Sequence, residues 1–471
     1  MGFLMYDIGL LVIFAVFVFS FLYRNRKNLK KEGLLFLYKA NWGIKLINYV
    51  GRRYKRTLKV LSYVSVVLGY ILMASAIYLV GKIIWLYALH PAVVRAIKIP
   101  PIMPLIPYLP QVFKLSFLPP FYFIYWIVIL AIIAITHEFA HGIFAAYNKV
   151  QTKTTGFGFF PFFLPVFLAA FVELNEKVMV TKKKFSQMSI LSAGTFANVI
   201  TGIFFFIIIW IFFSLAFSPA GVIFDDYSYS VVQISSIASI NNISVENTSY
   251  ENITRLIKNS SFNEIQTKEK KYVGVRGISD DKTQIALYDN APAINAGLIG
   301  AISEIQGVRI DSLEKLSKEL LKYSPGETIT IRTTLENGTQ DYNIILGEHP
   351  NLKGRVWLGI GFNEQKTDGF FNKVMLKLSS FRNSNLYYES ASGEFGWFIY
   401  NLLWWTILIS FSVAFVNMLP VGIFDGGRFF YLTVWGITKN EKVAKRAFSY
   451  MTYFFLFLLV FLMVIWARAF F

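Results

Sequence analysis

Two histidines and a glutamate stand close together in the run His137-Glu138-Phe139-Ala140-His141, which follows a long apolar stretch. Residues four apart on a helix share one face, so both imidazoles can bind one metal ion, with Glu138 beside them. The chain has no cysteine and only four histidines, so any metal site must be built from His, Asp or Glu. This spacing predicts a catalytic metal site.

The alternative is a buried histidine pair, or a short polar stripe that holds helices together. Within a bilayer, each ionisable group costs about 2.5 to 3.5 kcal/mol, even on the lenient insertion scale. Two histidines and a glutamate without a ligand would therefore be a large burden. The apolar surroundings favour metal catalysis over the alternative.

A catalytic zinc site takes three protein ligands and keeps one position open, so a third ligand is needed. The candidate is Asp425, which follows the fifth apolar segment in the stretch Asn417-Met418-Leu419-Pro420-Val421-Gly422-Ile423-Phe424-Asp425-Gly426-Gly427. Pro420 ends a helix and the glycines permit a turn, so the backbone can aim the carboxylate inward. Asp425 could instead cap the helix that follows it, and both roles are compatible.

The elements that position these residues must be membrane helices. Of the 471 residues, 55% are hydrophobic and 16% are charged, with a mean hydropathy of +0.50, whereas soluble domains carry about 25% charge. The net charge of +18 is explained by basic residues in cytoplasmic loops, so we expect no nucleic-acid partner. The expected surroundings are a lipid bilayer.

Six apolar runs are long enough to cross a hydrocarbon core of about 30 Å. They span approximately residues 3–23, 58–80, 121–147, 190–217, 395–419 and 448–467. Basic clusters follow the first, third and fifth runs, which predicts that the N-terminus lies outside and the metal site lies towards the cytoplasm. The predicted regions are an N-terminal two-helix membrane region (1–88), a proline-rich extracytoplasmic loop (89–120), a catalytic membrane core (121–217), an extracytoplasmic region (218–392) and a C-terminal membrane region (393–471).

The segment Gly156–Leu174 is too apolar for a solvated loop, and its glycines and prolines interrupt it too often for a spanning helix. We expect a re-entrant or strand-like element that packs against protein at membrane depth. Such an element could present an extended substrate to the site, or it could be a packing hairpin.

The HExxH run and the NxxPxxxxDG run resemble the motifs of the site-2 protease family of intramembrane zinc metalloproteases, over residues Phe121–Gly427. Gly194-Thr195-Phe196-Ala197-Asn198 is similar to the family's GxxxN motif, although Gly194 could simply be a helix-packing position. The resemblance implies that His137, His141 and Asp425 bind Zn2+. It also implies that Glu138 is the general base, which takes a proton from water and passes it to the leaving amide nitrogen. Asn198, Asn417 and Pro420 are candidates for substrate binding or for supporting the ligands.

Residues 218–392 are polar, and the part from Lys271 to Phe362 resembles a PDZ domain in its turn and short helix (290–298), its strand and turn (302–310), its helix (313–321) and its next strand (328–333). The glycine-rich loop that binds a peptide carboxylate is not recognisable. The spacing of Ile237, Ile240 and Val245 matches that of Ile302, Ile305 and Ile310, which indicates either a second PDZ-like unit or biased composition. Sequons agree with an outside location, at Asn242, Asn247, Asn252, Asn259 and Asn337.

The sequence therefore predicts a polytopic α-helical membrane protein with about six transmembrane helices and an inserted α+β PDZ-like domain. The predicted function is zinc-dependent proteolysis of single-span membrane proteins, in a prokaryotic cell membrane. An inactive scaffold that binds partners through its PDZ-like domain is one alternative, and a zinc transporter is another. The sequence does not specify an oligomeric state.

Overall fold

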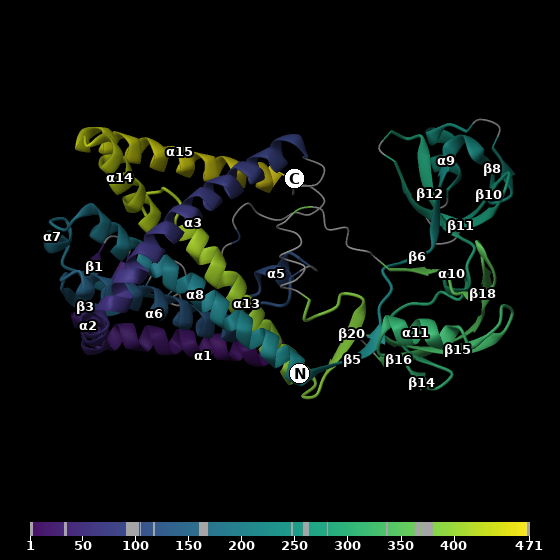
Figure 1. The fold of residues 1–471 in the computed structure, drawn as a ribbon, viewed down its shortest axis with the longest axis horizontal. Coiled ribbons are helices and arrows are strands. Elements are labelled where there is room, and N and C mark those ends of the chain that lie inside the picture. The colour runs from purple at the N-terminus through teal and green to yellow at the C-terminus, as the bar shows by residue number, and fades with distance from the viewer. Residues whose placement is uncertain are drawn as a thin grey trace. The chain divides into compact units, whose positions relative to one another are not determined.

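The computed structural model describes residues 3–32, 35–90, 103, 105–115, 118–159, 168–245, 248–257, 263–279, 281–335, 338–362, 369 and 380–468. The chain forms two compact units (Figure 1). Unit 1 comprises Met1–Ile209 and Phe398–Phe471, and unit 2 comprises Trp210–Trp397. Each unit is considered separately below.

Six helices in the described residues are long and apolar enough to cross a membrane, as the sequence predicts. They are α1 (Phe3–Arg24), α3 (Lys55–Leu89), α6 (Phe123–Tyr147), α8 (Lys184–Ala216), α13 (Glu394–Asn417) and α15 (Glu441–Arg468). Several are longer than the apolar runs, because helical hydrogen bonding continues past the point where the side chains turn polar. Thus α3 begins at Lys55 and ends at Leu89.

Shorter helices connect the spans of unit 1. They are η1 (Arg26–Asn28), α2 (Ile44–Arg53), α5 (Leu109–Val112), α7 (Glu176–Met179) and α14 (Asp425–Thr438). Much of the predicted proline-rich loop, including 91–102, lies outside the described residues.

A four-stranded antiparallel sheet lies in unit 1, in the order β1-β2-β3-β4. Its strands are β1 (Leu29–Glu32), β2 (Leu35–Ala40), β3 (Thr152–Phe159) and β4 (Leu168–Leu174). The strand-like element expected at 156–174 is thus confirmed, although 160–167 lie outside the described residues. The hairpin of β1 and β2, which occupies part of a stretch that reads as basic and amphipathic, extends this sheet.

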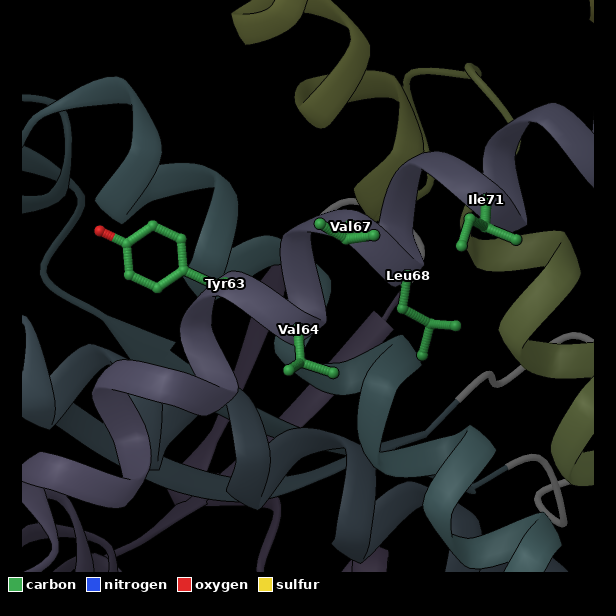
Figure 2. Close-up of a pocket in the computed structure, with 5 residues that line it drawn as sticks. All are labelled: Tyr63, Val64, Val67, Leu68 and Ile71. Carbon is green, nitrogen blue, oxygen red and sulfur yellow. The ribbon is translucent and has the colours of Figure 1, made fainter.

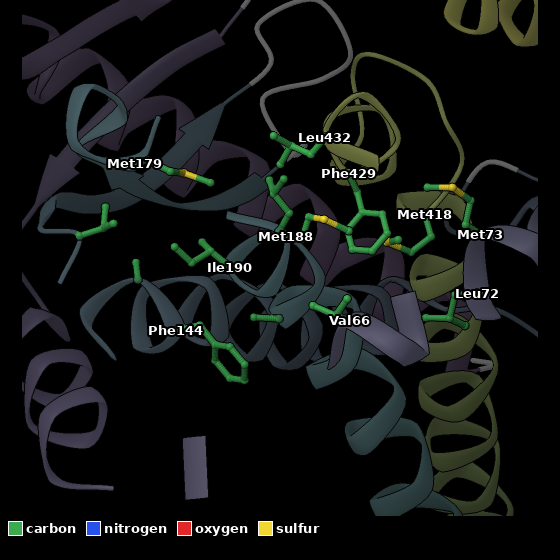
Figure 3. Packing of buried hydrophobic residues seen from close by; sticks show 14 of the residues in the cluster. Val66, Leu72, Met73, Phe144, Met179, Met188, Ile190, Met418, Phe429 and Leu432 are labelled. Atoms are coloured by element: carbon green, nitrogen blue, oxygen red, sulfur yellow. The ribbon is translucent and has the colours of Figure 1, made fainter. Parts of the chain in front are cut away.

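The largest core of unit 1 joins α3, α6, α8, α13 and α14. Met188 of α8 and Met418, which follows α13, lie beside the buried ring of Phe429 on α14 (Figure 3). Methionine is unbranched and fills irregular gaps, which suits the junction of several helices. This packing fixes α14, and therefore Asp425 at its first position.

An open apolar groove of about 330 Å³ runs along one face of α3 (Figure 2). It is lined by Tyr63, Val64, Val67, Leu68 and Ile71. Exposed apolar surface on a membrane-spanning helix is expected to face lipid tails, so the groove by itself indicates no ligand.

The described residues of unit 2 form two six-stranded sheets and two short two-stranded ones. One sheet has the order β7-β12-β11-β10-β8-β9, and the other combines β16-β15-β13-β5-β20 with β14 paired to β13. The strands are β5 (Phe217–Val222), β6 (Asp226–Tyr227), β7 (Tyr229–Gln233), β8 (Ile237–Ile240), β9 (Ile243–Ser244), β10 (Glu264–Thr267), β11 (Lys271–Ile278), β12 (Gln284–Asp289), β13 (Ala301–Ile305), β14 (Val308–Arg309), β15 (Thr328–Leu335), β16 (Gly338–Ile345), β17 (Gly347–His349), β18 (Leu352–Trp357), β19 (Ile360–Gly361) and β20 (Leu386–Ser390). The helices are η2 (Ile234–Ser236), α9 (Tyr250–Leu256), α10 (Pro292–Asn295) and α11 (Leu313–Leu320).

The two large sheets repeat one arrangement. In the first, β8, β9, α9, β10 and β11 follow one another, and β10 pairs with both β8 and β11. In the second, β13, β14, α11, β15 and β16 follow in the same order, and β15 pairs with both β13 and β16. Serine caps both helices, at Ser249 and Ser312. The shared pairing favours a true internal repeat over biased composition.

Of the five sequon asparagines, Asn247, Asn259 and Asn337 lie outside the described residues.

Candidate metal centre

Helix α6 places both predicted histidines on one buried face. The side chains of His137 and His141 are one helical turn apart, and their Nε2 atoms are 3.0 Å from each other. Both residues are less than a tenth exposed. The i, i+4 spacing therefore brings the two nitrogens to one point, as the sequence predicts.

The third predicted ligand comes from a distant part of the chain. Asp425 is the first residue of α14, and its Oδ2 lies 3.3 Å from Nε2 of His137 and 3.2 Å from Nε2 of His141. The helix start is preceded by Phe424 as N-cap residue, so Asp425 is not itself the cap. The three ligand atoms lie within 4.8 Å of one another. Among the described residues, these three form the one group of this kind that could hold a metal ion.

The turn before Asp425 depends on close backbone packing. Pro420 is buried in this turn, between the end of α13 and the start of α14. A Cβ at Gly426 would overlap the backbone of Met418, and a Cβ at Gly427 would lie 2.6 Å from the carbonyl carbon of Val421. The two glycines therefore let α14 begin against the preceding turn, which aims the carboxylate of Asp425 at the histidines.

The outer ring nitrogens of both histidines have partners. Nδ1 of His141 donates to the backbone oxygen of Ile190, at 2.7 Å, because a carbonyl can only accept. The side-chain amide nitrogen of Asn198 lies 3.0 Å from Nδ1 of His137, while the amide oxygen of Asn198 is buried without a partner among the described residues. Amide oxygen and nitrogen have the same shape, so a half-turn would let this oxygen accept from Nδ1–H of His137.

These contacts test whether the site fits a metal cation. With Nδ1 protonated, Nε2 of His141 carries a lone pair that points at the carboxylate oxygen of Asp425, 3.2 Å away. The half-turn at Asn198 gives His137 the same tautomer. Three acceptor atoms held this close repel one another, and a bound cation satisfies all three at once. The donor set of two imidazoles and one carboxylate suits zinc, and fixing the outer nitrogen is how metal-binding histidines are generally oriented.

A comparison with models of known protein families identifies the family of this chain. The family model for Peptidase family M50 matches residues 125–462. The chain belongs to this family. It is therefore a metallopeptidase of the site-2 protease type, and its apolar helices make it an integral, multi-pass membrane protein. No curated protein was found to match the chain.

Helix α8 of this M50 peptidase passes directly beside the two imidazoles. A Cβ at Gly194 would overlap Nε2 of His141 and lie 2.6 Å from Nε2 of His137. Gly194 and Asn198 are one turn apart, so α8 presents both of them to the histidines. In the GxxxN run, Gly194 thus occupies a position with no room for a side chain, and Asn198 contacts the predicted ligand His137.

The carboxylate of Glu138, which is next to His137 in the chain, also contacts the sheet. Its Oε2 accepts a hydrogen bond of 2.9 Å from the backbone nitrogen of Val172 on β4. Because β4 is the last strand of this sheet among the described residues, this contact places Glu138 at the edge of the sheet. The contact with Val172 and the role of Ile190 depend on backbone atoms, so residue types alone could not reveal them.

Two further residues of the M50 chain, Asn417 and Arg428, lie close to Asp425 in the sequence. Asn417, predicted as a supporting residue, is the half-buried last residue of α13, and among the described residues its side chain has no hydrogen bond. Arg428, three residues after Asp425, forms a two-point ion pair with Glu176, at 3.0 and 2.6 Å. This ion pair, which the motifs do not predict, links the first turn of α14 to the start of α7, the short helix that follows β4.

Proposed function

We propose that the chain is an intramembrane zinc endopeptidase that hydrolyses peptide bonds within or near the transmembrane segments of single-span membrane proteins. The observation that carries this proposal is the convergence of His137, His141 and Asp425, from two distant segments, beside Glu138. Membership of a peptidase family supports an enzyme over a scaffold or a transporter.

His137, His141 and Asp425 would hold the zinc ion. When bound, zinc supplies Lewis-acid chemistry, which polarises a peptide carbonyl and makes water nucleophilic near neutral pH. Asn198 and the backbone oxygen of Ile190 hold the imidazoles in orientation. Three protein ligands leave a further position open for substrate, as catalytic zinc sites require.

Glu138 would act as the general base. It stands next to a ligand on α6, where its carboxylate can take a proton from the attacking water and deliver it to the leaving amide nitrogen. The hydrogen bond from Val172 holds one carboxylate oxygen and leaves the other for the proton. Both proton steps therefore use one side chain.

Strand β4 would present the substrate. The backbone N–H of Val172 points away from β3, and alternate residues of an antiparallel ladder turn their backbone groups the same way, so Ala170 also presents its N–H and C=O at this edge. A substrate helix must unwind before attack, because its peptide groups are hydrogen-bonded internally. An unwound segment can pair with the edge of β4 beside Glu138 and so lie extended at the site.

The repeated modules of unit 2 would be two PDZ-like domains on the extracytoplasmic side. Their order of strands and helix supports this, since α10, β13, β14, α11 and β15 match the elements expected from the sequence. Such domains could admit substrates whose outside portion is already trimmed, or bind an exposed chain end. By the positive-inside pattern, the metal centre lies towards the cytoplasm of a prokaryotic cell.

Removal and return of zinc tests the proposed reaction. The full-length protein is reconstituted in vesicles with a single-span substrate, and the cut is located by mass spectrometry. We expect one cut within or next to the apolar segment, which stops when a chelator removes zinc and resumes when zinc is restored. Cleavage that survives complete zinc removal would contradict the proposal, as would a cut far from the membrane.

A further inference from the structure

Helix α1 carries a buried carboxylate that the proposed reaction does not use. Asp7 is the only acidic residue of α1 and is 2% exposed. A buried carboxylate is unfavourable unless hydrogen-bond donors surround it. The donors therefore indicate what Asp7 does.

Among the residues that the structure describes, the donors to Asp7 belong to the beginning of α6 or to the loop before it. Oδ2 accepts from the backbone nitrogen of Phe123, at 2.7 Å, and Oδ1 accepts from that of Ile124, at 3.0 Å. The hydroxyl of Tyr108 donates to Oδ2 at 2.6 Å. Phe123 and Ile124 are the first two residues of α6, and Tyr122, the residue before them, provides no side-chain cap. Asp7 thus caps the helix that carries His137 and His141, and it does so from another helix.

The conformation of Tyr108 shows that this arrangement is tightly specified. Tyr108 has a φ of 66°, which is unusual for an aromatic residue. Its backbone nitrogen donates to the oxygen of Phe121, at 2.7 Å, while its hydroxyl binds Asp7. The strained backbone persists because contacts at both ends of the residue hold it.

The N-terminal region also holds the other end of α6, near the ligands. A Cβ at Gly43 would lie 3.2 Å from two atoms of the ring of Phe139, which stands between the two histidines. Ile47 of α2 is fully buried and lies where a Cβ of Gly142 would come within 2.9 Å of it. Helix α6 is therefore held at its start by Asp7 and at the metal site by α2 and the residues before it. The N-terminal partners in these contacts, Asp7, Gly43 and Ile47, lie outside the matched family region, 125–462.

We propose that Asp7 is a positioning residue of the metal centre. By binding the first two amides of α6, it fixes the height and the rotation of that helix against α1, which runs alongside it (Figure 1). His137 follows Phe123 by about 21 Å along the helix axis, so Asp7 acts through α6 and does not touch reacting atoms. A shift of about 1 Å at the ligands can lower a rate by about 100-fold. The inference rests on the proposed zinc-peptidase function.

The test compares Asp7→Ala, Asp7→Asn and Val18→Ala in the full-length protein. Val18 is the matched control, because it is buried on the same helix about three turns away. Each variant is reconstituted with the single-span substrate, and Co2+ replaces zinc so that its visible absorption reports the ligand geometry. Thermal midpoints record any general loss of stability.

We expect Asp7→Ala to lower kcat by about 10- to 100-fold, with little change in KM, and to alter the Co2+ absorption. Asp7→Asn keeps one acceptor oxygen, so its kcat and its Co2+ absorption should lie between those of Asp7→Ala and the unmodified protein. Val18→Ala should lower the thermal midpoint while kcat and the absorption stay as in the unmodified protein. If Asp7→Ala loses stability but keeps the original kcat and absorption, the positioning role is wrong. If the unmodified protein gives no Co2+ absorption, the proposed metal site is wrong, and the inference fails with it.

Discussion

Replacing Glu138 with glutamine is expected to stop cleavage while zinc stays bound. Glutamine has the same size, and its side-chain oxygen can still accept the hydrogen bond from the backbone of Val172, which is 2.9 Å long in the native chain. It cannot take a proton from water, and general-base catalysis contributes about 10²- to 10⁴-fold to rates. The rate should therefore fall by a factor in that range, measured on a single-span substrate in vesicles, with zinc counted by elemental analysis.

Glu173→Gln is the matched control for that experiment. Glu173 is the residue after Val172 on β4, but its carboxylate binds Lys39 of β2, at 2.5 Å, and Thr154 of β3, at 2.8 Å. The control removes one negative charge from the strand that Glu138 contacts and leaves the proposed general base in place, so cleavage should change only a few-fold. A Glu138→Gln protein that binds zinc and cleaves within tenfold of the native rate would show that Glu138 is not the base.

Gly194→Ala is expected to weaken metal binding strongly, because it adds a methyl group beside both imidazoles. The new Cβ would overlap Nε2 of His141 and crowd Nε2 of His137, at 2.6 Å. These are ligand atoms held by Ile190 and Asn198, so they cannot simply move aside. Overpacking of this kind costs about 1 to 3 kcal/mol, which corresponds to a loss of about 5- to 150-fold in zinc affinity if it falls on the metal-bound state.

The same substitution at Gly202 serves as its control. Gly202 lies on α8 about two turns from Gly194, and a Cβ there would lie 2.9 Å from the ring of Phe411, not near a ligand. Gly202→Ala should reduce thermal stability and leave zinc affinity unchanged in a competition titration with a chelator. Equal loss of zinc in both variants would mean that crowding in α8 acts generally and that Gly194 has no special place beside the ligands.

The two histidine ligands could be predicted from the sequence because their spacing determines their relative position on a helix. The i, i+4 relation puts His137 and His141 on one face in any helix. Asp425 is predictable for a different reason, since a single acid after an apolar segment, followed by two glycines, needs a partner. The meeting of these two segments depends on packing around Met418 and Phe429, which no local pattern specifies.

The contacts that orient the site could not be predicted in the same way. Ile190 and Val172 act through backbone atoms, which are the same in every residue type. Asp7 reads as a lone acid near the end of an apolar segment, and its role depends on which helix start lies beside it. The hairpin of β1 and β2 could not be predicted either, because Leu35–Ala40 lies in a basic amphipathic stretch and its pairing with β3 joins residues far apart in the sequence.

The membrane-spanning helices can be predicted from hydropathy alone. The apolar segment that forms β3 and β4 beside the site is not a helix, so hydropathy does not predict its structure. Strands β3 and β4 hydrogen-bond to each other through their backbones, which is why an apolar stretch with glycines and prolines need not be a helix. In unit 2, Ile240 and Ile305 occupy equivalent positions in the two repeats, because each is the last residue of a strand before a tight hairpin turn.

X-ray absorption at the zinc edge of the zinc-loaded, full-length protein tests the central claim most directly. The account predicts one zinc per chain with two imidazole ligands, His137 and His141, and otherwise oxygen ligands that include Asp425. Asp425→Ala should keep the two-imidazole signal at much lower zinc occupancy, because one of three protein ligands is gone. A native protein that binds no stoichiometric zinc, or whose zinc has fewer or more than two imidazoles, would contradict the account.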